Sequence, residues 1–188
     1  MDNRTHILEQ AMAIFADRGY DASGVQEICQ AAHVTKPTLY HYFGSKRGLL
    51  EAVLDRFSHE LESSVTQAAA QSQDLPLTME RLAAAFFDFA RRHPQYYRMQ
   101  LAMVFAPRDS EARQAVAERN QRIHDQVEAM FERASQYHGN MRGRQRFYAA
   151  SYIGQLNTCI GLWLNGHLEL DDALVQRVAK QFQHGIYS

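Results

Sequence analysis

A stretch near the start of the chain, VTKPTLYHYFGSKRG at residues 34–48, carries the side chains best suited to bind a polyanion. Three consecutive rings with polar tips stand between two lysines: Tyr40, His41 and Tyr42 between Lys36 and Lys46. No Asp or Glu occurs from residue 28 to residue 50. Cations and hydroxyls attract phosphate groups, whereas a carboxylate would repel them. The stretch is therefore a candidate contact surface for the phosphate backbone of a nucleic acid.

Three short helices are needed to hold this stretch in place, and the sequence marks their boundaries. Apolar side chains recur at helical spacing over residues 4–18. Ser23 then opens a second helix, where the segment SGVQ fits a capping box with the Ser hydroxyl at one end and the Gln side chain at the other. Thr35 caps a third helix, and Pro37 is tolerated in its first turn because the N–H group there has no intrahelical partner.

The third helix has a buried and an exposed face. Leu39 and Phe43 stand four residues apart and continue an apolar stripe, so we expect them to point inward. The outward-facing residues are Thr35, Lys36, Pro37, Thr38, Tyr40, His41 and Tyr42. Lys and Tyr side chains hold phosphate oxygens, Thr and Lys at the helix start reach base edges, and Pro37 or a Thr methyl touches a thymine methyl. Lys46 lies beside the N-terminus of the next helix, which also favours a phosphate.

Two interpretations of this helix-turn-helix pattern are open at this point. Three-helix units of this kind also occur in proteins that never touch DNA, and the turn alone does not separate the two classes. The absence of acidic residues around the exposed rings favours DNA.

The rest of the chain predicts an all-α fold of about nine helices. Beyond the third helix, the expected helices run from Ser45 to Ala70, Leu77 to Arg92, Gln95 to Val104, Ser110 to about Ala134, Arg144 to Asn165, and onward from Asp171. We expect two domains, residues 1–50 for DNA binding and residues 51–188 for effector binding and dimerisation. The boundary falls inside the fourth helix, so the two should be rigidly joined.

Residues 5–53 resemble the N-terminal domain of the TetR family of transcriptional regulators. The resemblance rests on Phe15 with Gly19 and Tyr20, on Val25 with Ile28, and on the motif TLYHYF-x-SK that ends at Lys46. It implies a dimeric, ligand-responsive repressor with two recognition helices in successive major grooves of operator DNA.

The same resemblance implies a role for each matched residue. Base and groove contacts would come from Thr35, Lys36, Pro37 and Thr38, and phosphate contacts from Ser23, Tyr40, Tyr42 and Lys46. His41 is also expected to bind DNA, and the resemblance leaves the type of its contact open. His33 departs from the family, which usually has a turn glycine there. Either His33 adopts a left-handed conformation, which His tolerates better than bulky residues, or the turn differs slightly.

The long helix near the C-terminus carries small residues along one face. Its positions Phe147, Ser151, Gly154, Thr158 and Gly161 recur every three to four residues, and a separate aliphatic face is left for the core. The last helix offers Leu174, Val178 and Phe182. Packing within the chain is the alternative, but together these residues resemble the family's dimer interface, so we expect a homodimer.

Aromatic and Met residues predict an adaptable apolar pocket in the C-terminal domain, although most such residues simply fill a core. The candidates are Phe86, Phe89, Met99, Met103 and Phe105, with a mildly polar stripe of Tyr148, Tyr152, Gln155 and Cys159. Cys159 is either a redox switch or a small buried hydrophobe. The chain has only two cysteines, which lie far apart, so we expect no disulfide. It shows no signal peptide and no apolar segment long enough to cross a membrane, so we expect a cytoplasmic protein that does not contact a membrane.

No nucleotide-binding, hydrolase, zinc or redox motif occurs, and the nine His residues are scattered. A small helical enzyme is therefore disfavoured, and we expect no metal and no cofactor. The sequence predicts a dimeric repressor that a small apolar or amphipathic ligand releases from its operator. The alternative is a ligand-independent DNA-binding regulator controlled by a protein partner.

Overall fold

The computed structural model describes the backbone of residues 2–70, 74–137 and 141–187. Within these ranges the chain forms nine helices and no strand, which confirms the all-α prediction. The helices are α1 (Asn3–Arg18), α2 (Val25–Ala31), α3 (Lys36–Phe43), α4 (Lys46–Ala70), α5 (Leu75–Arg92), α6 (Pro94–Val104), α7 (Glu111–Ser135), α8 (Gln145–Leu164) and α9 (Asp172–Tyr187). Across the described ranges, no helix combines the length and the apolar character that a bilayer-spanning helix needs.

The chain divides into two compact units. The first comprises residues 1–59 and 93–119, and the second residues 60–92 and 120–188. Both α4 and α7 contribute to each unit, because each helix continues past the boundary. This division follows tertiary contacts and differs from the functional division expected at residue 50, which stays a prediction.

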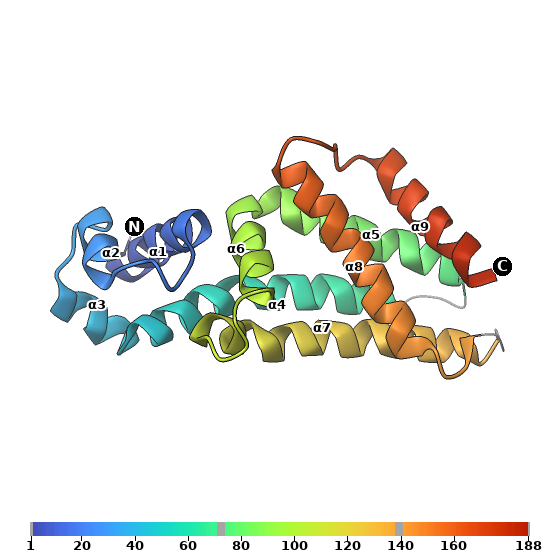
Figure 1. Cartoon of the computed structure of the whole chain (residues 1–188), viewed down its shortest axis with the longest axis horizontal. Helices are drawn as coiled ribbons and strands as arrows, with labels where there is room; N and C mark the ends of the chain where they lie inside the picture. Colours follow the sequence, from blue (N-terminus) through green and yellow to red (C-terminus); the bar gives the residue numbers. More distant parts are fainter. Residues whose placement is uncertain (1, 71–73, 138–140, 188) are drawn as a thin grey trace. The chain divides into compact units, whose positions relative to one another are not determined.

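The first unit is built around α1. This helix packs against α2, α3 and α6, and Figure 1 shows α1, α2 and α3 gathered at the N-terminal end of α4. Its core is aliphatic and aromatic, and the largest fully buried side chains include Ile7, Phe15, Ile28, Leu39 and Leu49. The inward positions predicted for Leu39 and Phe43 are confirmed, since both side chains are buried.

Four helices begin at the residues expected to start them, and the side chain of each of these residues caps the helix. The side chains of Thr35, Ser45, Ser110 and Asp171 each accept a hydrogen bond from a backbone N–H in the first turn of α3, α4, α7 and α9. The capping box predicted at Ser23 is wrong. Gly24 is the N-cap of α2, and no side chain caps it. The Ser23 hydroxyl instead donates to the Gly19 carbonyl at 2.6 Å and is buried.

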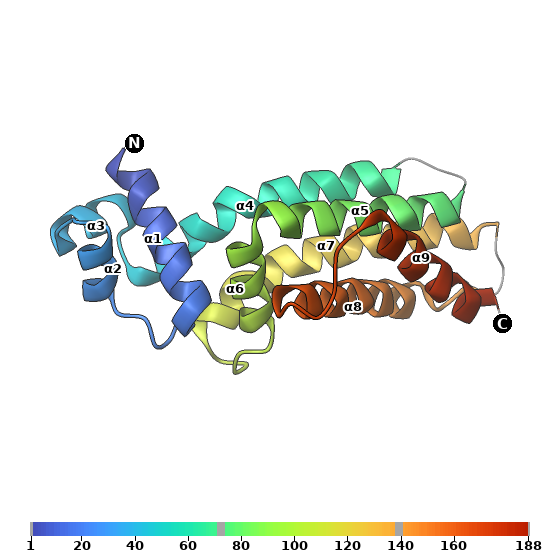
Figure 2. The same cartoon turned by 90° about the horizontal axis from the view of Figure 1, so that it is seen from above.

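The second unit holds α5 against α8 and α9, and Figure 2 shows these three helices side by side. An aromatic cluster joins α7, α8 and α9, with ring centroids of Phe131, Tyr148 and Phe182 about 6 Å apart and Tyr152 4.9 Å from Phe182. The Tyr152 hydroxyl donates to the Met79 carbonyl at 2.7 Å, so a fully buried phenol is satisfied within the core.

Candidate nucleic-acid interface

The turn between α2 and α3 sets the direction of the exposed helix. His33 has φ of 54°, and it is the one described non-glycine residue with positive φ. The left-handed conformation considered for His33 is therefore confirmed. It allows the Val34 N–H to reach back to the Cys29 carbonyl at 3.0 Å, which closes the end of α2 before the chain enters α3.

The outer face of α3 presents a cation, hydroxyls and rings to solvent. Lys36, Pro37, Tyr40, His41 and Tyr42 are all exposed, with Tyr40 and Tyr42 at 43% and 41%. The His41 and Tyr42 rings meet edge to face at 5.5 Å. Rings exposed to this degree leave apolar surface in contact with water, and a bound partner would cover that surface. Without an acidic residue, this face suits a polyanion.

The first turn of α3 is organised by two threonines. Thr35 caps the helix, and its hydroxyl lies 2.9 Å from that of Thr38. The Thr35 hydroxyl therefore meets both the N–H and the hydroxyl of Thr38, and the Thr38 hydroxyl meets that of Thr35. A hydroxyl has further lone pairs to offer, so this pair can still meet a base edge while the cap holds it in position.

The corner between α3 and α4 is unusually tight. Gly44 ends α3 with φ of 71°, a conformation that favours glycine. A Cβ atom added at Gly48, in the first turn of α4, would lie 2.0 Å from the Phe43 carbonyl oxygen. Only glycine fits at this position without a shift of the backbone, so the end of α3 and the start of α4 are in close contact.

Lys46 is held by the turn that follows α1. Its Nζ donates to the Tyr20 carbonyl at 2.6 Å and lies 4.2 Å from the centre of the Tyr20 ring. Burial lowers the pKa of Lys46, although Asp21 and Glu111 oppose this effect. An ammonium group has three donors, so the Tyr20 contact leaves others for a phosphate. Ser23 is less available to a phosphate than Lys46, because its hydroxyl is buried and donates its hydrogen bond to the Gly19 carbonyl.

Comparison with known proteins agrees with this geometry. The sequence model described as "Bacterial regulatory proteins, tetR family" matches residues 7–53. The HTH-type transcriptional activator FasR of Mycolicibacterium smegmatis is 31% identical over 98% of this chain and 82% of its own length. The chain belongs to the TetR family. It is accordingly a DNA-binding transcriptional regulator, and the prediction that it is not an enzyme is confirmed.

Other transcriptional regulators resemble it over shorter ranges or in fold. The HTH-type transcriptional repressor KstR2 of Rhodococcus jostii is 32% identical over 45% of this chain and 42% of its own length. The regulator FadR of Bacillus subtilis, solved in complex with stearoyl-CoA, has a TM-score of 0.79 at 18% identity, over 95% of this chain and 96% of that one. The second likeness shows the shared fold.

The residues predicted to line a ligand pocket lie in different surroundings. In the first unit, Met99 and Met103 of α6 are buried and wall a small cavity of about 240 Å³ beside the end of α1. In the second unit, Phe86, Phe89, Tyr148 and Tyr152 are buried, while Gln155 and Cys159 are half-buried. Phe105 is 84% exposed and contributes no enclosed wall. The pocket itself stays a prediction.

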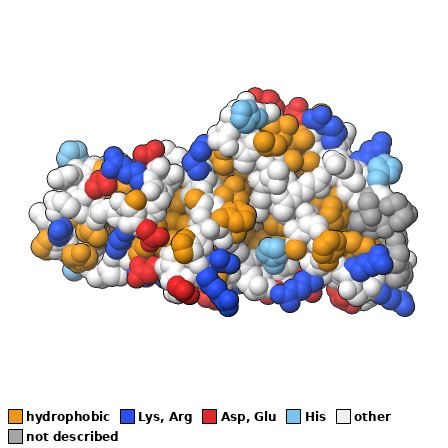
Figure 3. Space-filling view, in the orientation of Figure 1, with side chains coloured by type: hydrophobic (Ala, Val, Ile, Leu, Met, Phe, Trp, Pro, Cys, Tyr) orange, Lys and Arg blue, Asp and Glu red, His pale blue; other side chains and the backbone are white. Residues whose placement is uncertain are grey.

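The residues predicted for the dimer interface fall into two groups. On α8, Gly154 and Thr158 are exposed, Ser151 and Gly161 are half-buried, and Phe147 is 70% exposed. On α9, Leu174 and Val178 are buried within the protomer, and Phe182 packs on Tyr152. Hydrophobic side chains reach the surface on the side of the molecule that shows α8 (Figure 3). The α8 face is therefore the part that a second copy could cover.

Sequence reasoning missed two features that the structure brings forward. Leu162 on α8 is 43% exposed and extends the apolar part of that surface. Tyr20, which contributed only to the family resemblance, donates its hydroxyl to Glu111 at 2.5 Å. A contact between residues 91 positions apart has no local signal in the sequence. A helical-wheel comparison of α8 could have found Leu162.

Proposed function

We propose that this TetR-family regulator is a homodimeric repressor whose operator affinity falls when an amphipathic ligand binds. The observation that carries the proposal is the outer face of α3, where exposed Lys36, Tyr40 and Tyr42 stand without an acidic neighbour. The contact roles predicted from the family pattern for Thr35, Lys36, Pro37, Thr38, Tyr40, Tyr42 and Lys46 are retained as part of it. Ser23 has the weakest claim, because its hydroxyl is buried and engaged.

Dimerisation is supported by the α8 face. A Cβ atom added at Gly154 or Gly161 would meet nothing within 4 Å, so packing inside the protomer does not require glycine at these two positions. Small residues do allow a second helix to approach closely. Two protomers paired through α8 would present two recognition helices, as an operator with two half-sites requires.

A long-chain acyl-CoA is the ligand class we would test. The Bacillus subtilis relative was solved with stearoyl-CoA, and the second unit of this chain is rich in buried aromatic and Met side chains. Such side chains suit an acyl chain. Activation of transcription is the second candidate function, because the relative FasR is named an activator.

The test begins with operator sites enriched by the full-length protein from a random library of DNA duplexes. We expect an inverted repeat, bound by a dimer in sedimentation experiments. Stearoyl-CoA should then weaken binding about 5–150-fold, the usual range of allosteric coupling, whereas stearate and coenzyme A, added separately as controls, should do less. Unchanged affinity with every acyl-CoA would favour control by a protein partner. A reporter gene separates repression from activation.

A further inference from the structure

A chain of polar contacts links the helix-turn-helix to the start of α7. It consists of Tyr20, Arg47, Glu51, Asp55, Glu111 and Arg119, which we call the α7 network. All six residues belong to the first compact unit. They come from the turn after α1, from α4 and from α7, which are far apart in sequence.

Tyr20 forms one end of the network. Its ring is buried, lies 5.3 Å from the Phe15 ring and carries Lys46 Nζ on its face. Only the hydroxyl faces α7, where it donates to Glu111 Oε2 at 2.5 Å. Burial and the bond to Glu111 raise the pKa of the Tyr20 hydroxyl, so it remains a donor at every physiological pH.

Glu111 is the first residue of α7, and its two polar ends are bound by Tyr20 of the turn after α1 and by Arg47 of α4. The carboxylate accepts from Tyr20, and the backbone carbonyl accepts from Arg47 Nη1 at 2.8 Å. Arg47 lies in the first turn of α4, next to Lys46. Glu111 thus joins α7 to the turn after α1 and to the start of α4 at the same time.

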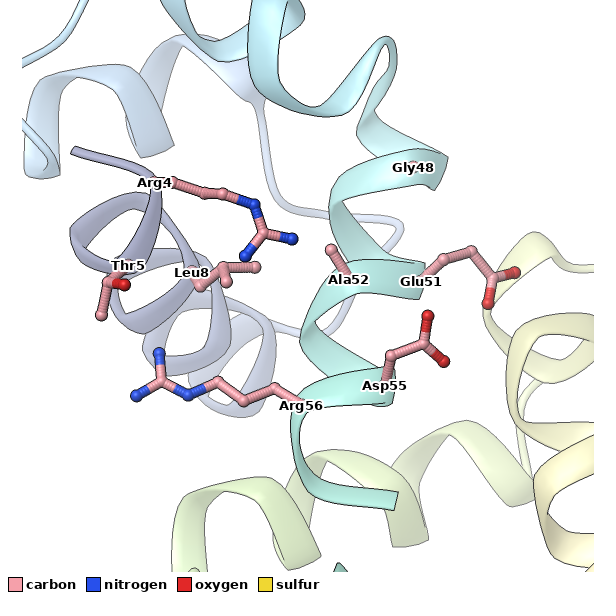
Figure 4. A pocket seen from close by; sticks show the side chains of 8 residues that line it. All are labelled: Arg4, Thr5, Leu8, Gly48, Glu51, Ala52, Asp55 and Arg56. Atoms are coloured by element: carbon pink, nitrogen blue, oxygen red, sulfur yellow. The ribbon is translucent and has the colours of Figure 1, made fainter. Parts of the chain in front are cut away.

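Two carboxylates of α4 complete the network. Glu51 pairs with Arg47 at 2.7 Å through one oxygen and with Arg119 at 2.8 Å through the other. Arg119 also bonds to Asp55. Figure 4 shows Glu51 and Asp55 on the side of α4 that faces the α7 ribbon. The Arg119 side chain is 13% exposed and Glu51 is 32% exposed, so this pair is shielded from solvent more than an ordinary surface ion pair, whereas Asp55 is 58% exposed.

The position of α3 depends on these anchors. At Gly48 the first turn of α4 lies directly against the Phe43 carbonyl at the end of α3, so we expect a shift of α4 to displace α3 as well. The network ties that first turn to α7. Beyond Arg119, α7 continues as one uninterrupted helix into the second unit, which also contains the exposed face of α8.

We propose that Tyr20, Arg47, Glu111 and Arg119 are positioning residues that set the distance between the two recognition helices of the DNA-bound dimer. None of them needs to touch DNA for this role. The inference rests on the proposed dimer that binds two half-sites. Breaking the network should leave each half-site contact intact and loosen the spacing between the two contacts.

Tyr20→Phe is the test variant, because it removes one hydroxyl and keeps the buried ring. Tyr137→Phe is the matched control, since Tyr137 is 68% exposed and lies outside the network. Affinity is measured for the enriched operator, for a single half-site, and for the operator with one base pair inserted at its centre. That insertion lengthens the spacing by about 3.4 Å and rotates one half-site by roughly 35°.

We expect Tyr20→Phe to bind the operator about ten-fold more weakly, the size of one hydrogen bond to a charged group. Half-site affinity should stay within about two-fold, and the penalty for the inserted base pair should shrink. Glu111→Ala should give the same pattern, and the double variant should add little, because both changes break one contact. Tyr137→Phe should match the wild type, and circular dichroism checks that each variant is folded.

The two possible failures can be told apart. A wild-type protein that tolerates the insertion overturns the two-half-site dimer, and this inference with it. A wild-type protein that is sensitive to the insertion, together with Tyr20 and Glu111 variants that are equally sensitive, overturns the positioning role alone. Additive effects of Tyr20→Phe and Glu111→Ala also overturn it.

Discussion

Replacing Lys46 by Met separates the two roles that this residue has in the regulator. Its Nζ donates to the Tyr20 carbonyl at 2.6 Å and lies 4.2 Å from the ring centre, while its sequence position predicts a phosphate contact. Met keeps the length of the side chain and removes the charge. A purely DNA-contacting lysine would leave stability unchanged, whereas a lysine that also fixes the turn would not.

The structural contribution follows from these contacts. A hydrogen bond from a charged donor contributes about 1.5–3 kcal/mol, and a cation over a ring about 0.5–1 kcal/mol. Burial lowers the pKa of Lys46, so desolvation offsets part of this gain, and its partial exposure weakens the rest. We therefore expect Lys46→Met to lose about 1.5 kcal/mol. For a chain of this size that corresponds to a fall in Tm of roughly 3–6 °C.

The DNA contribution is visible in the salt dependence. Loss of one phosphate contact makes the slope of log K against log salt shallower by about 0.9. Non-specific and operator binding should weaken by similar factors. Lys36→Met is the matched control: Lys36 is exposed, so Tm should not change, and the loss should appear as about 1–3 kcal/mol of specificity at one base position per half-site.

Thermal unfolding, monitored by circular dichroism, gives the change in Tm. Fluorescence anisotropy of labelled DNA at several salt concentrations gives the salt slope. A Tm of Lys46→Met equal to that of the wild type would refute the Tyr20 contact. An unchanged salt slope would refute the phosphate contact and leave Lys46 as a residue that only holds the turn.

Three further changes test other parts of the structure. Gly48→Ala should gain about 1 kcal/mol of helix propensity but lose about 1–3 kcal/mol of stability, because the added Cβ would lie 2.0 Å from the Phe43 carbonyl oxygen. A higher Tm together with normal operator affinity would contradict the close contact between α3 and α4. Gly154→Leu, where a Cβ meets nothing in the protomer, should raise the dimer dissociation constant at least about ten-fold without unfolding α1 to α3; a normal dimer in sedimentation would count against the α8 interface. Burial lowers the pKa of His124, so the unfolded chain takes up this proton first and stability should fall as pH drops through about 6.5. His124→Asn should therefore show a smaller loss of urea midpoint between pH 7.5 and pH 5, and equal losses would assign the pH dependence to other groups.

Local sequence signals accounted for most of the secondary structure and for the outer face of the recognition helix. Thr35 and Ser45 cap their helices as predicted, because a cap depends on residues within three positions of each other. The inward direction of Leu39 and the outward direction of Tyr42 follow from helical periodicity alone. Ser23 was the exception, since its hydroxyl had a competing acceptor in the Gly19 carbonyl.

Tertiary structure decided which of the predicted residues are available for a partner. Leu174 and Phe147 both belong to helical patterns that suited an interface, yet Leu174 is buried within the protomer and Phe147 is 70% exposed. Periodicity identifies an apolar face but not what covers it, because the covering helix is distant in sequence. The same reason applies to Lys46 and Tyr20, whose contact joins positions 26 residues apart.

The family, the all-α class and the acid-free face that suits DNA could all be predicted from local patterns, because they depend on residue types and on spacings of a few positions. Only the tertiary structure placed Glu111 against Tyr20 and Arg47, and Arg119 against Glu51. Many charged residues on the helices could have paired, and their charges do not specify a partner. The partner is set by the packing of α4 and α7, which is a property of the whole folded chain.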